Sequence, residues 1–283
     1  MSIIRGDNGL DVKVGQFTSE DNMGLYYNYW PAQSKSAPCA IYLHGLESHM
    51  GWFFNLAEFL HSKGINVYAF DRRGSGLNKD SCKNFSSKYI LNDLKTFIDI
   101  VRKEHPGSRI FLIGLCLGGK IAVSFVSSYP DYIDGLILIS PSLKNKLKFS
   151  LSDKLSILFS PNRLLKVPIE DRMFTSNEKY LTHIGKDSMR LKYIPAGHLL
   201  EIAKMDRMVN VASGNIKIPV LLMLAGIDEI IDTHGIKRWY EKLPSSDKTI
   251  KIYKNYRHIL TFEENAAEVM QDVSEWIWER ANG

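Results

Sequence analysis

The feature that most constrains the fold is a glycine-rich hexapeptide with the sequence Gly114-Leu115-Cys116-Leu117-Gly118-Gly119. The apolar run Ile110–Ile113 precedes it and predicts a buried strand, and the apolar segment Leu117–Ser128 follows it and predicts a helix. Where a strand turns directly into a helix, the residues two before and two after the central one must be small, because the two backbones approach closely. Glycines fill both positions here. The pattern predicts a tight turn that lifts Cys116 above a sheet and aims the first amides of the helix at it.

Elsewhere in the chain, short runs rich in β-branched and aromatic residues alternate with longer amphipathic segments. This alternation is typical of βαβ units that build a mainly parallel sheet covered by helices on both faces. We expect eight strands, over Val12–Phe17, Leu25–Trp30, Ala40–Leu43, Asn66–Phe70, Ile110–Gly114, Leu136–Ser140, Val220–Ala225 and Thr249–Tyr253. We expect helices near Trp52–His61, Tyr89–Glu104, Leu117–Ser128, His234–Glu241 and Ala266–Ala281.

The alternation breaks after Pro141 and resumes at Ile218-Pro219-Val220. We therefore expect a core domain formed by residues 1–141 and 216–283, with residues 142–215 inserted as a helical cap without strands. Within the cap, Phe149–Phe159 has apolar residues at near-helical spacing. We expect this helix to pack onto the core domain; a substrate lid or a membrane-facing helix is the alternative.

Two further polar residues follow later strands in the order typical of a nucleophile, an acid and a histidine. Asp228 comes after the run Leu221–Leu224, and His258 comes after the run Ile250–Tyr253. A thiol needs an imidazole to become a thiolate, and the imidazole needs a carboxylate on its other nitrogen. The sequence therefore predicts Cys116, His258 and Asp228 as a catalytic triad, with Asp232 as a weaker candidate for the acid.

The segment His44-Gly45-Leu46 ends another predicted strand. A backbone amide here, that of Leu46, would pair with the amide of Leu117 to stabilise the oxyanion of a tetrahedral intermediate. His44 itself is interpreted as a structural residue.

With these blocks in place, the chain resembles the serine aminopeptidase or monoacylglycerol-lipase-like branch of the α/β-hydrolase superfamily. The match rests on four blocks, which are His44-Gly45-Leu46, Asp71-Arg72-Arg73-Gly74-Ser75-Gly76, the hexapeptide around Cys116, and Gly226-Ile227-Asp228 with His258. The resemblance implies an α/β-hydrolase fold with an eight-stranded sheet, the same triad positions, Leu46 and Leu117 as oxyanion amides, and a lid over an apolar acyl pocket. It also implies that the Asp71 block is structural. Two positions depart from the pattern, because most relatives carry serine in place of Cys116, and their usual Gly-Glu-His is Glu47-Ser48-His49 here.

Charge is unevenly distributed along the chain. The formal net charge is +5, but residues 144–217 hold 14 Lys or Arg against 7 Asp or Glu, which makes the cap basic. A solvated face is the simpler interpretation; attraction to an anionic carrier or to a membrane surface is the alternative. Nucleic acid is not expected as a partner, since no binding motif accompanies the charge.

The three cysteines are too few and too scattered to predict disulfides or zinc, and we interpret Cys39 as a buried thiol and Cys82 as incidental. The sequence has neither a secretory signal nor an apolar run long enough to span a membrane, so a cytoplasmic protein is expected. It also lacks the glycine-rich fingerprints of nucleotide sites, so no cofactor and no metal are expected.

Three functions remain open from the sequence. The first is a hydrolase of small acyl esters or thioesters that forms a thioester at Cys116. The second is an acyltransferase that moves an acyl group from acyl-CoA or an acyl carrier protein to an amine, alcohol or thiol, because thioesters react readily with such acceptors. The third is a non-catalytic protein that binds a ligand in the same pocket.

Overall fold

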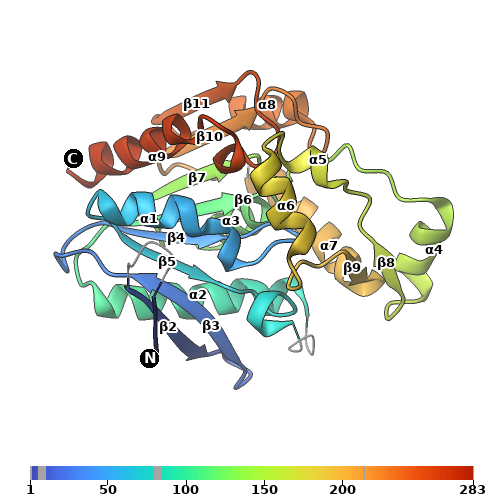
Figure 1. Cartoon of the computed structure of the whole chain (residues 1–283), viewed down its shortest axis with the longest axis horizontal. Helices are drawn as coiled ribbons and strands as arrows, with labels where there is room; N and C mark the ends of the chain where they lie inside the picture. The colour runs from blue at the N-terminus through green and yellow to red at the C-terminus, as the bar shows by residue number, and fades with distance from the viewer. Residues whose placement is uncertain (1, 6–10, 80–84, 213, 283) are drawn as a thin grey trace.

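Among the residues that the structure describes, nine strands form one sheet at the centre of the molecule (Figure 1). The computed structural model describes residues 2–5, 11–79, 85–212 and 214–282. The strands of the sheet are β1 (Ser2–Arg5), β2 (Asp11–Thr18), β3 (Gly24–Trp30), β4 (Cys39–Leu43), β5 (Asn66–Phe70), β6 (Ile110–Leu115), β7 (Gly135–Ile139), β10 (Val220–Ala225) and β11 (Lys248–Tyr253). Their order across the sheet is β1-β2-β3-β5-β4-β6-β7-β10-β11.

All eight predicted strands are present in this sheet, and β1 joins them as an additional edge strand, antiparallel to β2. Four residues are too short for an alternating pattern to be recognised in the sequence. The pairs β2–β3 and β3–β5 are also antiparallel, whereas every pair from β5 to β11 is parallel. This is the order and direction of strands in an α/β-hydrolase fold. It brings the carboxyl ends of the parallel strands to one edge of the sheet, where ligands of such sheets bind.

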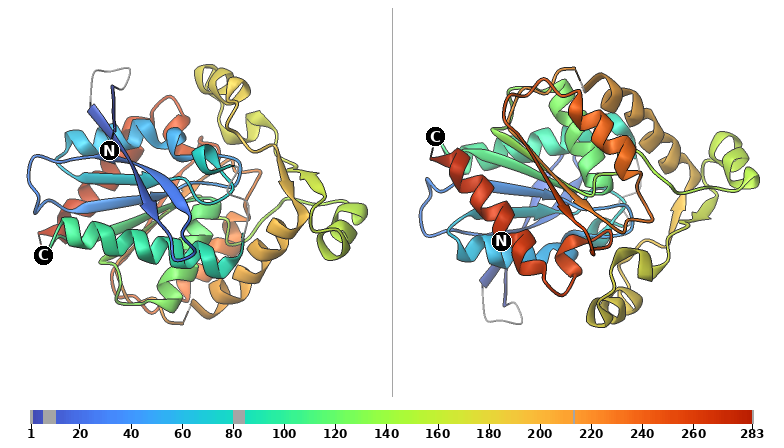
Figure 2. Two further views of the ribbon diagram at one scale, coloured as in Figure 1. Left: turned by 90° about the horizontal axis from the view of Figure 1, so that it is seen from below. Right: turned by 90° about the horizontal axis from the view of Figure 1, so that it is seen from above.

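Helices cover both faces of the sheet, as Figure 2 shows in views from below and above. They are α1 (Phe54–Ser62), α2 (Ser87–Glu104), α3 (Leu117–Ser128), α8 (Thr233–Glu241) and α9 (Ala266–Ala281), with short 3-10 turns at Met50–Phe53, Gly76–Asn78 and Leu260–Phe262. Helices α1 and α9 contact each other on one face, and α2 and α3 contact each other on the opposite face. Every residue of strands β4, β5, β6, β7 and β10 is buried in consequence.

The chain between β7 and β10 leaves the sheet and returns to it (Figure 1). It contains α4 (Leu151–Phe159), β8 (Leu164–Lys166), α5 (Asp171–Phe174), α6 (Glu178–Lys186), β9 (Tyr193–Pro195) and α7 (Ala196–Ala212). The expectation of a purely helical insertion is wrong, because β8 and β9 pair as a small antiparallel ribbon. Each of these strands has three residues, too few to produce a period in the sequence.

Helix α4 does not pack onto the core domain, so the expectation made from its apolar spacing is wrong. Its side chains Leu151, Leu158 and Phe159 are 76%, 63% and 77% exposed, and Ser156 is its one buried residue. Figure 1 places α4 at the end of the molecule farthest from the C-terminus. Helical spacing identifies an apolar face, but it does not identify what covers that face.

Helix α3 approaches the sheet more closely than side chains would permit. A Cβ atom on Gly118 would lie 2.0 Å from the carbonyl oxygen of Leu43 at the end of β4. A Cβ atom on Gly114 would lie 2.6 Å from the carbonyl oxygen of Gly118. The two glycines predicted to be necessary at the turn are therefore required by backbone contacts, and the first turn of α3 is fixed against the ends of β4 and β6.

Replacing Gly118 with alanine tests this packing. We expect Gly118→Ala to lower the free energy of unfolding by about 3 kcal/mol or more, because a methyl group cannot displace a backbone carbonyl without moving the strand or the helix. Gly185→Ala is the matched control: it lies in α6, where the nearest atom to the new Cβ is 3.9 Å away, and it should change stability by about 1 kcal/mol or less. Urea unfolding followed by circular dichroism measures both, and equal effects would contradict the packing argument.

Candidate active site

Cys116 lies at the turn between β6 and α3. Its backbone has φ 51° and ψ −114°, a combination that residues with a Cβ rarely adopt. Two of its backbone hydrogen bonds join it to β7 and the chain that follows: the Cys116 N–H donates to the carbonyl of Ile139 at 3.2 Å, and the Ser142 N–H donates to the carbonyl of Cys116 at 2.8 Å. The neighbouring parallel strand therefore stabilises the strained turn, and the cysteine side chain is 7% exposed.

His258 and Asp228 meet at the same edge of the sheet, in the loops that follow β11 and β10. Nδ1 of His258 lies 2.8 Å from Oδ2 of Asp228. The other carboxylate oxygen accepts the N–H groups of Ile230 and Ile231 at 2.8 and 3.0 Å, so both oxygens of Asp228 are engaged. Asp232, the weaker candidate from the sequence, instead accepts the N–H of Gly235 at the start of α8.

The charges around His258 favour its protonated form. Burial by itself lowers the pKa of the imidazolium, but the negative charges of Asp228 and Cys116 outweigh burial and raise the pKa to about 10. Burial raises the pKa of Asp228, yet the imidazolium and the two backbone N–H groups outweigh burial, and the net effect is a lowered pKa. Among the described side chains, Nε2 of His258 has no partner of ordinary hydrogen-bond geometry. The histidine thus has one nitrogen held by Asp228 and the other available to a reacting group.

The two predicted oxyanion amides lie next to the cysteine. Leu117 is the first residue of α3, and its N–H has no acceptor within the helix. Gly45 lies against the cysteine, since a Cβ on Gly45 would be 3.3 Å from Cβ of Cys116. Within the described chain, neither the Leu46 nor the Leu117 amide donates a backbone hydrogen bond. Both amides are therefore available to a ligand.

Arg72 and His44 fix the backbone that carries the Leu46 amide. Nη2 of Arg72 donates to the carbonyls of Gly45 at 2.9 Å and Leu46 at 2.6 Å, and Nδ1 of His44 lies 2.9 Å from the same Gly45 carbonyl. In a trans peptide the C=O and N–H point in opposite directions, so holding the Gly45 carbonyl aims the Leu46 N–H away from Arg72.

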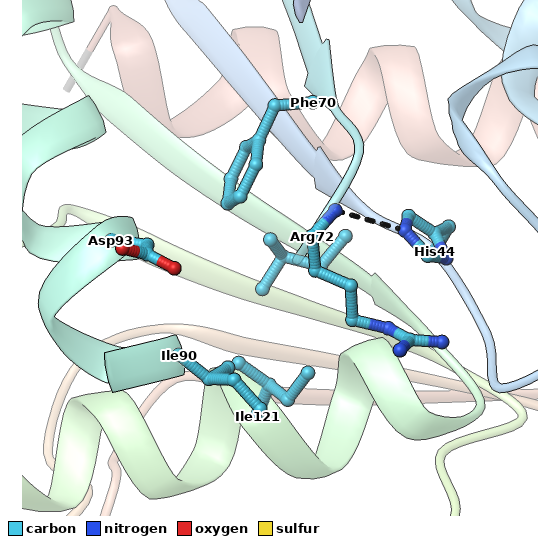
Figure 3. A pocket seen from close by; sticks show the side chains of 7 residues that line it. His44, Phe70, Arg72, Ile90, Asp93 and Ile121 are labelled. Carbon is cyan, nitrogen blue, oxygen red and sulfur yellow. Dashed lines mark hydrogen bonds between the residues drawn. The ribbon is translucent and has the colours of Figure 1, made fainter. Parts of the chain in front are cut away.

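His44 acts here as a neutral structural residue, in agreement with the interpretation from the sequence. Burial, helped by the Arg72 cation, holds the pKa of His44 well below its usual range. Its Nε2 accepts the main-chain N–H of Arg72 at 3.2 Å, as Figure 3 shows.

A cavity of about 10 Å³ beside these residues is also lined by Phe70 and Ile121. It is large enough for about one water molecule and too small for an acyl chain.

The cap contacts the same loop from the opposite side. Nε of Arg190 donates to Oε2 of Glu47 at 2.7 Å, and the N–H of Leu191 donates to the carbonyl of Glu47 at 2.9 Å. Nε2 of His49 lies 3.0 Å from Oδ2 of Asp187. Sequence analysis did not identify Arg190 or Glu47 as site residues, because a pair separated by 143 positions leaves no local signal.

Other residues singled out in the sequence lie away from this site. Cys39 is fully buried, and burial raises the pKa of its thiol to about 12. Cys82 lies outside the described residues. Across the described ranges, no three His, Cys, Asp or Glu side chains gather as they would around a metal ion. Within the same part of the chain, no helix is both long and apolar enough to cross a membrane.

Replacing the acid tests the charge coupling at His258. We expect Asp228→Asn to lower the pKa of His258 by about 1–3, because it removes the carboxylate that contributes most to the raised value. In the wild type, the folded pKa of about 10 exceeds the unfolded value of 6.5. Protonation therefore stabilises the fold below pH 6.5, and that contribution is lost as the pH rises through 10.

Titration of the His258 ring proton by NMR, assigned with His258→Gln, measures this pKa. Asp232→Asn is the matched control, since that carboxylate caps α8 and does not contact His258. An unchanged titration in Asp228→Asn would contradict the coupling.

Comparison with known proteins agrees with this architecture. A family model described as "Serine aminopeptidase, S33" matches residues 35–265. Human monoglyceride lipase is 27% identical, with 92% of this chain and 88% of its own length covered. The monoacylglycerol lipase of Mycolicibacterium smegmatis is 21% identical, with coverage of 92% and 95%.

Solved structures give the same result. The monoacylglycerol lipase of Paleococcus ferrophilus aligns with a TM-score of 0.79 at 25% identity, covering 91% of this chain and 100% of that one. A soluble variant of the monoglyceride lipase of Saccharomyces cerevisiae, in complex with a substrate analog, aligns with a TM-score of 0.84 at 22% identity and covers 95% of each chain. Because the family model matches residues 35–265 and these structures align over more than nine-tenths of the chain, this chain has the α/β-hydrolase fold and belongs to the serine aminopeptidase S33 family.

Proposed function

We propose that this protein hydrolyses carboxylic acyl esters or thioesters, with Cys116 as nucleophile, His258 as general base and acid, and Asp228 as the group that orients the histidine. The observation that carries the proposal is the His258 ring, held at Nδ1 by Asp228, with no ordinary hydrogen bond at Nε2 and with Cys116, on its strained turn, close enough to raise the pKa of the ring. The similarity to monoglyceride lipases supports an acyl ester as the substrate class.

Acylation begins with attack of the Cys116 thiolate on the carbonyl carbon of the ester. The new C–S bond moves an electron pair onto the carbonyl oxygen, and the amides of Leu46 and Leu117 stabilise that oxyanion. As the intermediate collapses, the bond to the leaving oxygen breaks and His258 donates the Nε2 proton to it. The products of this half-reaction are an alcohol and a thioester at Cys116. A cation beside a thiol favours the thiolate, which suits the raised pKa of His258.

Deacylation reverses these roles. Neutral His258 removes a proton from water as the water oxygen bonds to the thioester carbonyl, and the same two amides stabilise the second oxyanion. The C–S bond then breaks, which releases the carboxylic acid and restores the thiolate with its imidazolium partner. Each half-reaction therefore requires the same oxyanion amides.

Acyl transfer from acyl-CoA or an acyl carrier protein is the second candidate function. The exposed cations Lys144, Lys146 and Lys148 at the start of the cap favour it, since both donors carry phosphate groups. In this reaction an amine, alcohol or thiol would replace water in the second half-reaction. The experiment below separates it from hydrolysis.

We further propose that α4 contacts a membrane surface. Leucines and a phenylalanine on this helix are exposed, and basic side chains precede it in the sequence. An apolar face beside cations is the combination that binds the interface of an anionic bilayer.

The catalytic proposal predicts an acyl adduct at Cys116. With p-nitrophenyl octanoate or octanoyl-CoA, intact mass should increase by one acyl group in the wild type and in Cys39→Ala, the matched control for a second buried thiol. Cys116→Ala should form no adduct, and both Cys116→Ala and His258→Ala should lower turnover by more than about 1,000-fold. Rapid clearance of the adduct by water supports a hydrolase, whereas an adduct that persists until an amine or thiol is added supports a transferase. Absence of both an adduct and turnover with every ester would contradict both functions and leave ligand binding.

The membrane proposal predicts weaker vesicle binding when α4 loses its apolar side chains. The double variant Leu155→Ser with Leu158→Ser should bind vesicles containing phosphatidylserine at least about tenfold more weakly, because each buried leucine contributes about 1.5–3 kcal/mol. Leu77→Ser is the control, since this side chain is 49% exposed on the core domain. Sedimentation with vesicles measures binding, and equal binding by all variants would rule out α4 as the contact.

A further inference from the structure

The loop that carries one oxyanion amide is held from two sides. We call residues His44–His49 the oxyanion loop, following the role proposed above for the Leu46 amide. From the core, Arg72 holds the carbonyls of Gly45 and Leu46. From the cap, the Leu191 amide holds the carbonyl of Glu47. Three consecutive carbonyls are therefore anchored, the third by a segment inserted more than 100 residues later in the chain.

Arg190 adds a charged contact to the cap side of this loop. Its side chain and that of Glu47 are each 2% exposed, and their Nε–Oε2 distance is 2.7 Å. Nη1 of the same guanidinium lies 2.5 Å from Oδ1 of Asp171 in α5, and the guanidinium also lies 5.2 Å from the ring centre of Phe174. One buried cation thus joins the oxyanion loop to α5.

Helix α5 is in turn fixed to the loop that carries the catalytic histidine candidate. The N–H of His258 donates to the carbonyl of Met173 at 3.4 Å, and the N–H of Ile259 donates to the carbonyl of Phe174 at 2.8 Å. Arg190 therefore joins the oxyanion loop to α5, and α5 in turn contacts the loop that carries His258.

We propose that Arg190 is a positioning residue that aligns the Leu46 amide for oxyanion stabilisation, by anchoring Glu47 against α5; this inference rests on the proposed function. Arg190 touches no reacting atom and acts through the loop. Its guanidinium presents donors in a rigid planar fork, which fixes both distance and angle between two carboxylates. Lysine could supply the charge but not this geometry.

The electrostatics of Glu47 agree with an anchoring role. Burial raises the pKa of Glu47 to about 7, and Arg190 is the main group that opposes this effect. Two other cap side chains also act on Glu47: Lys192 lowers its pKa, as Arg190 does, whereas Asp171 raises it, as burial does. Without Arg190, Glu47 would be a buried carboxyl group with its main counter-charge removed. We expect the carboxyl to take up a proton or turn toward solvent, and either change releases the loop.

Cys116 can react in two ways, by ester turnover and by alkylation. Comparing the two rates distinguishes a misplaced oxyanion loop from general disruption of the active site. Ester turnover forms a tetrahedral oxyanion in both half-reactions, so it needs the Leu46 amide. Alkylation of Cys116 by iodoacetamide is a direct displacement at carbon that forms no oxyanion, so it needs only the thiolate and His258. A misplaced loop should therefore slow turnover and leave alkylation unchanged.

The test compares Arg190→Met, Arg190→Lys and Glu47→Gln with the wild type. Arg172→Met is the matched control, since Arg172 is also a cap arginine, lies beside Asp171 in α5, and pairs with Glu170 at the surface, where their side chains are 71% and 62% exposed. For each protein, kcat and KM are measured with p-nitrophenyl octanoate, and the alkylation rate of Cys116 is measured by intact mass. Near-UV circular dichroism establishes that each variant is folded. Glu47→Gln leaves the backbone carbonyl of residue 47 free to accept the Leu191 N–H as before. This variant therefore remains informative if Arg190→Met does not fold.

We expect Arg190→Met and Glu47→Gln to lower kcat at least about tenfold, since loss of one oxyanion donor costs about 100–1,000-fold. KM and the alkylation rate should change by less than about threefold, Arg190→Lys should restore only part of kcat, and Arg172→Met should match the wild type. Unchanged kcat in the folded variants would overturn the inference, as would an equal loss of turnover and alkylation. Failure of the wild type to turn over any ester would instead overturn the proposed function, so the two failures are distinguishable.

Discussion

The contact between the first turn of α3 and the carbonyl end of β4 determines the geometry of the whole site. Gly118 permits this contact, because any side chain there would overlap the Leu43 carbonyl. The contact places Cys116 at the end of β6, directs the free Leu117 amide to the same side, and leaves Gly45 against the cysteine. The strained φ angle of Cys116 is thus imposed by packing between backbones and does not depend on any side chain that could adjust its conformation.

The sequence was most informative where a function depends on neighbouring residues. The turn at Cys116 needs glycines at fixed positions, and the strands before Asp228 and His258 are short apolar runs, so local patterns were enough to predict these three residues as a triad. Because β10 and β11 are adjacent and parallel, the loops that carry Asp228 and His258 meet, whereas Asp232 in the same loop is engaged at the start of α8. Parallel neighbours bring the residues at their ends together without further information.

The sequence was least informative where one segment meets another across the molecule. The spacing in α4 is that of an amphipathic helix, but the same spacing occurs in helices that face a core, a lipid or a partner. Arg190 illustrates the same limit for charge, because it contributes to the basic excess of the cap and yet is buried between Glu47 and Asp171. Composition counts such residues as surface charge, although their environment gives them a different role.

Two acidic residues of the cap contact the core domain, and this leaves the surface of the cap more basic. Asp187 contacts His49 in the oxyanion loop, and Asp206 in α7 receives the buried Lys120 of α3 at 2.7 Å. These carboxylates contact core residues, whereas Lys144, Lys146 and Lys148 remain at the surface. The cap is thus anchored to the core partly through its acids and presents many of its cations to solvent.

The contacts of Glu47 give a physical account of the sequence Glu47-Ser48-His49, which departs from the family's Gly-Glu-His pattern. Glu47 directly follows the residue whose amide is the proposed oxyanion donor, at the position where the family pattern that the sequence resembles has glycine. A buried carboxylate contributes little net stability even when paired, because desolvation offsets most of the attraction. The raised pKa of Glu47 agrees with that balance. The contribution of the pair is therefore geometric in the proposed role: Arg190 holds Glu47 at a fixed position relative to Asp171 in α5.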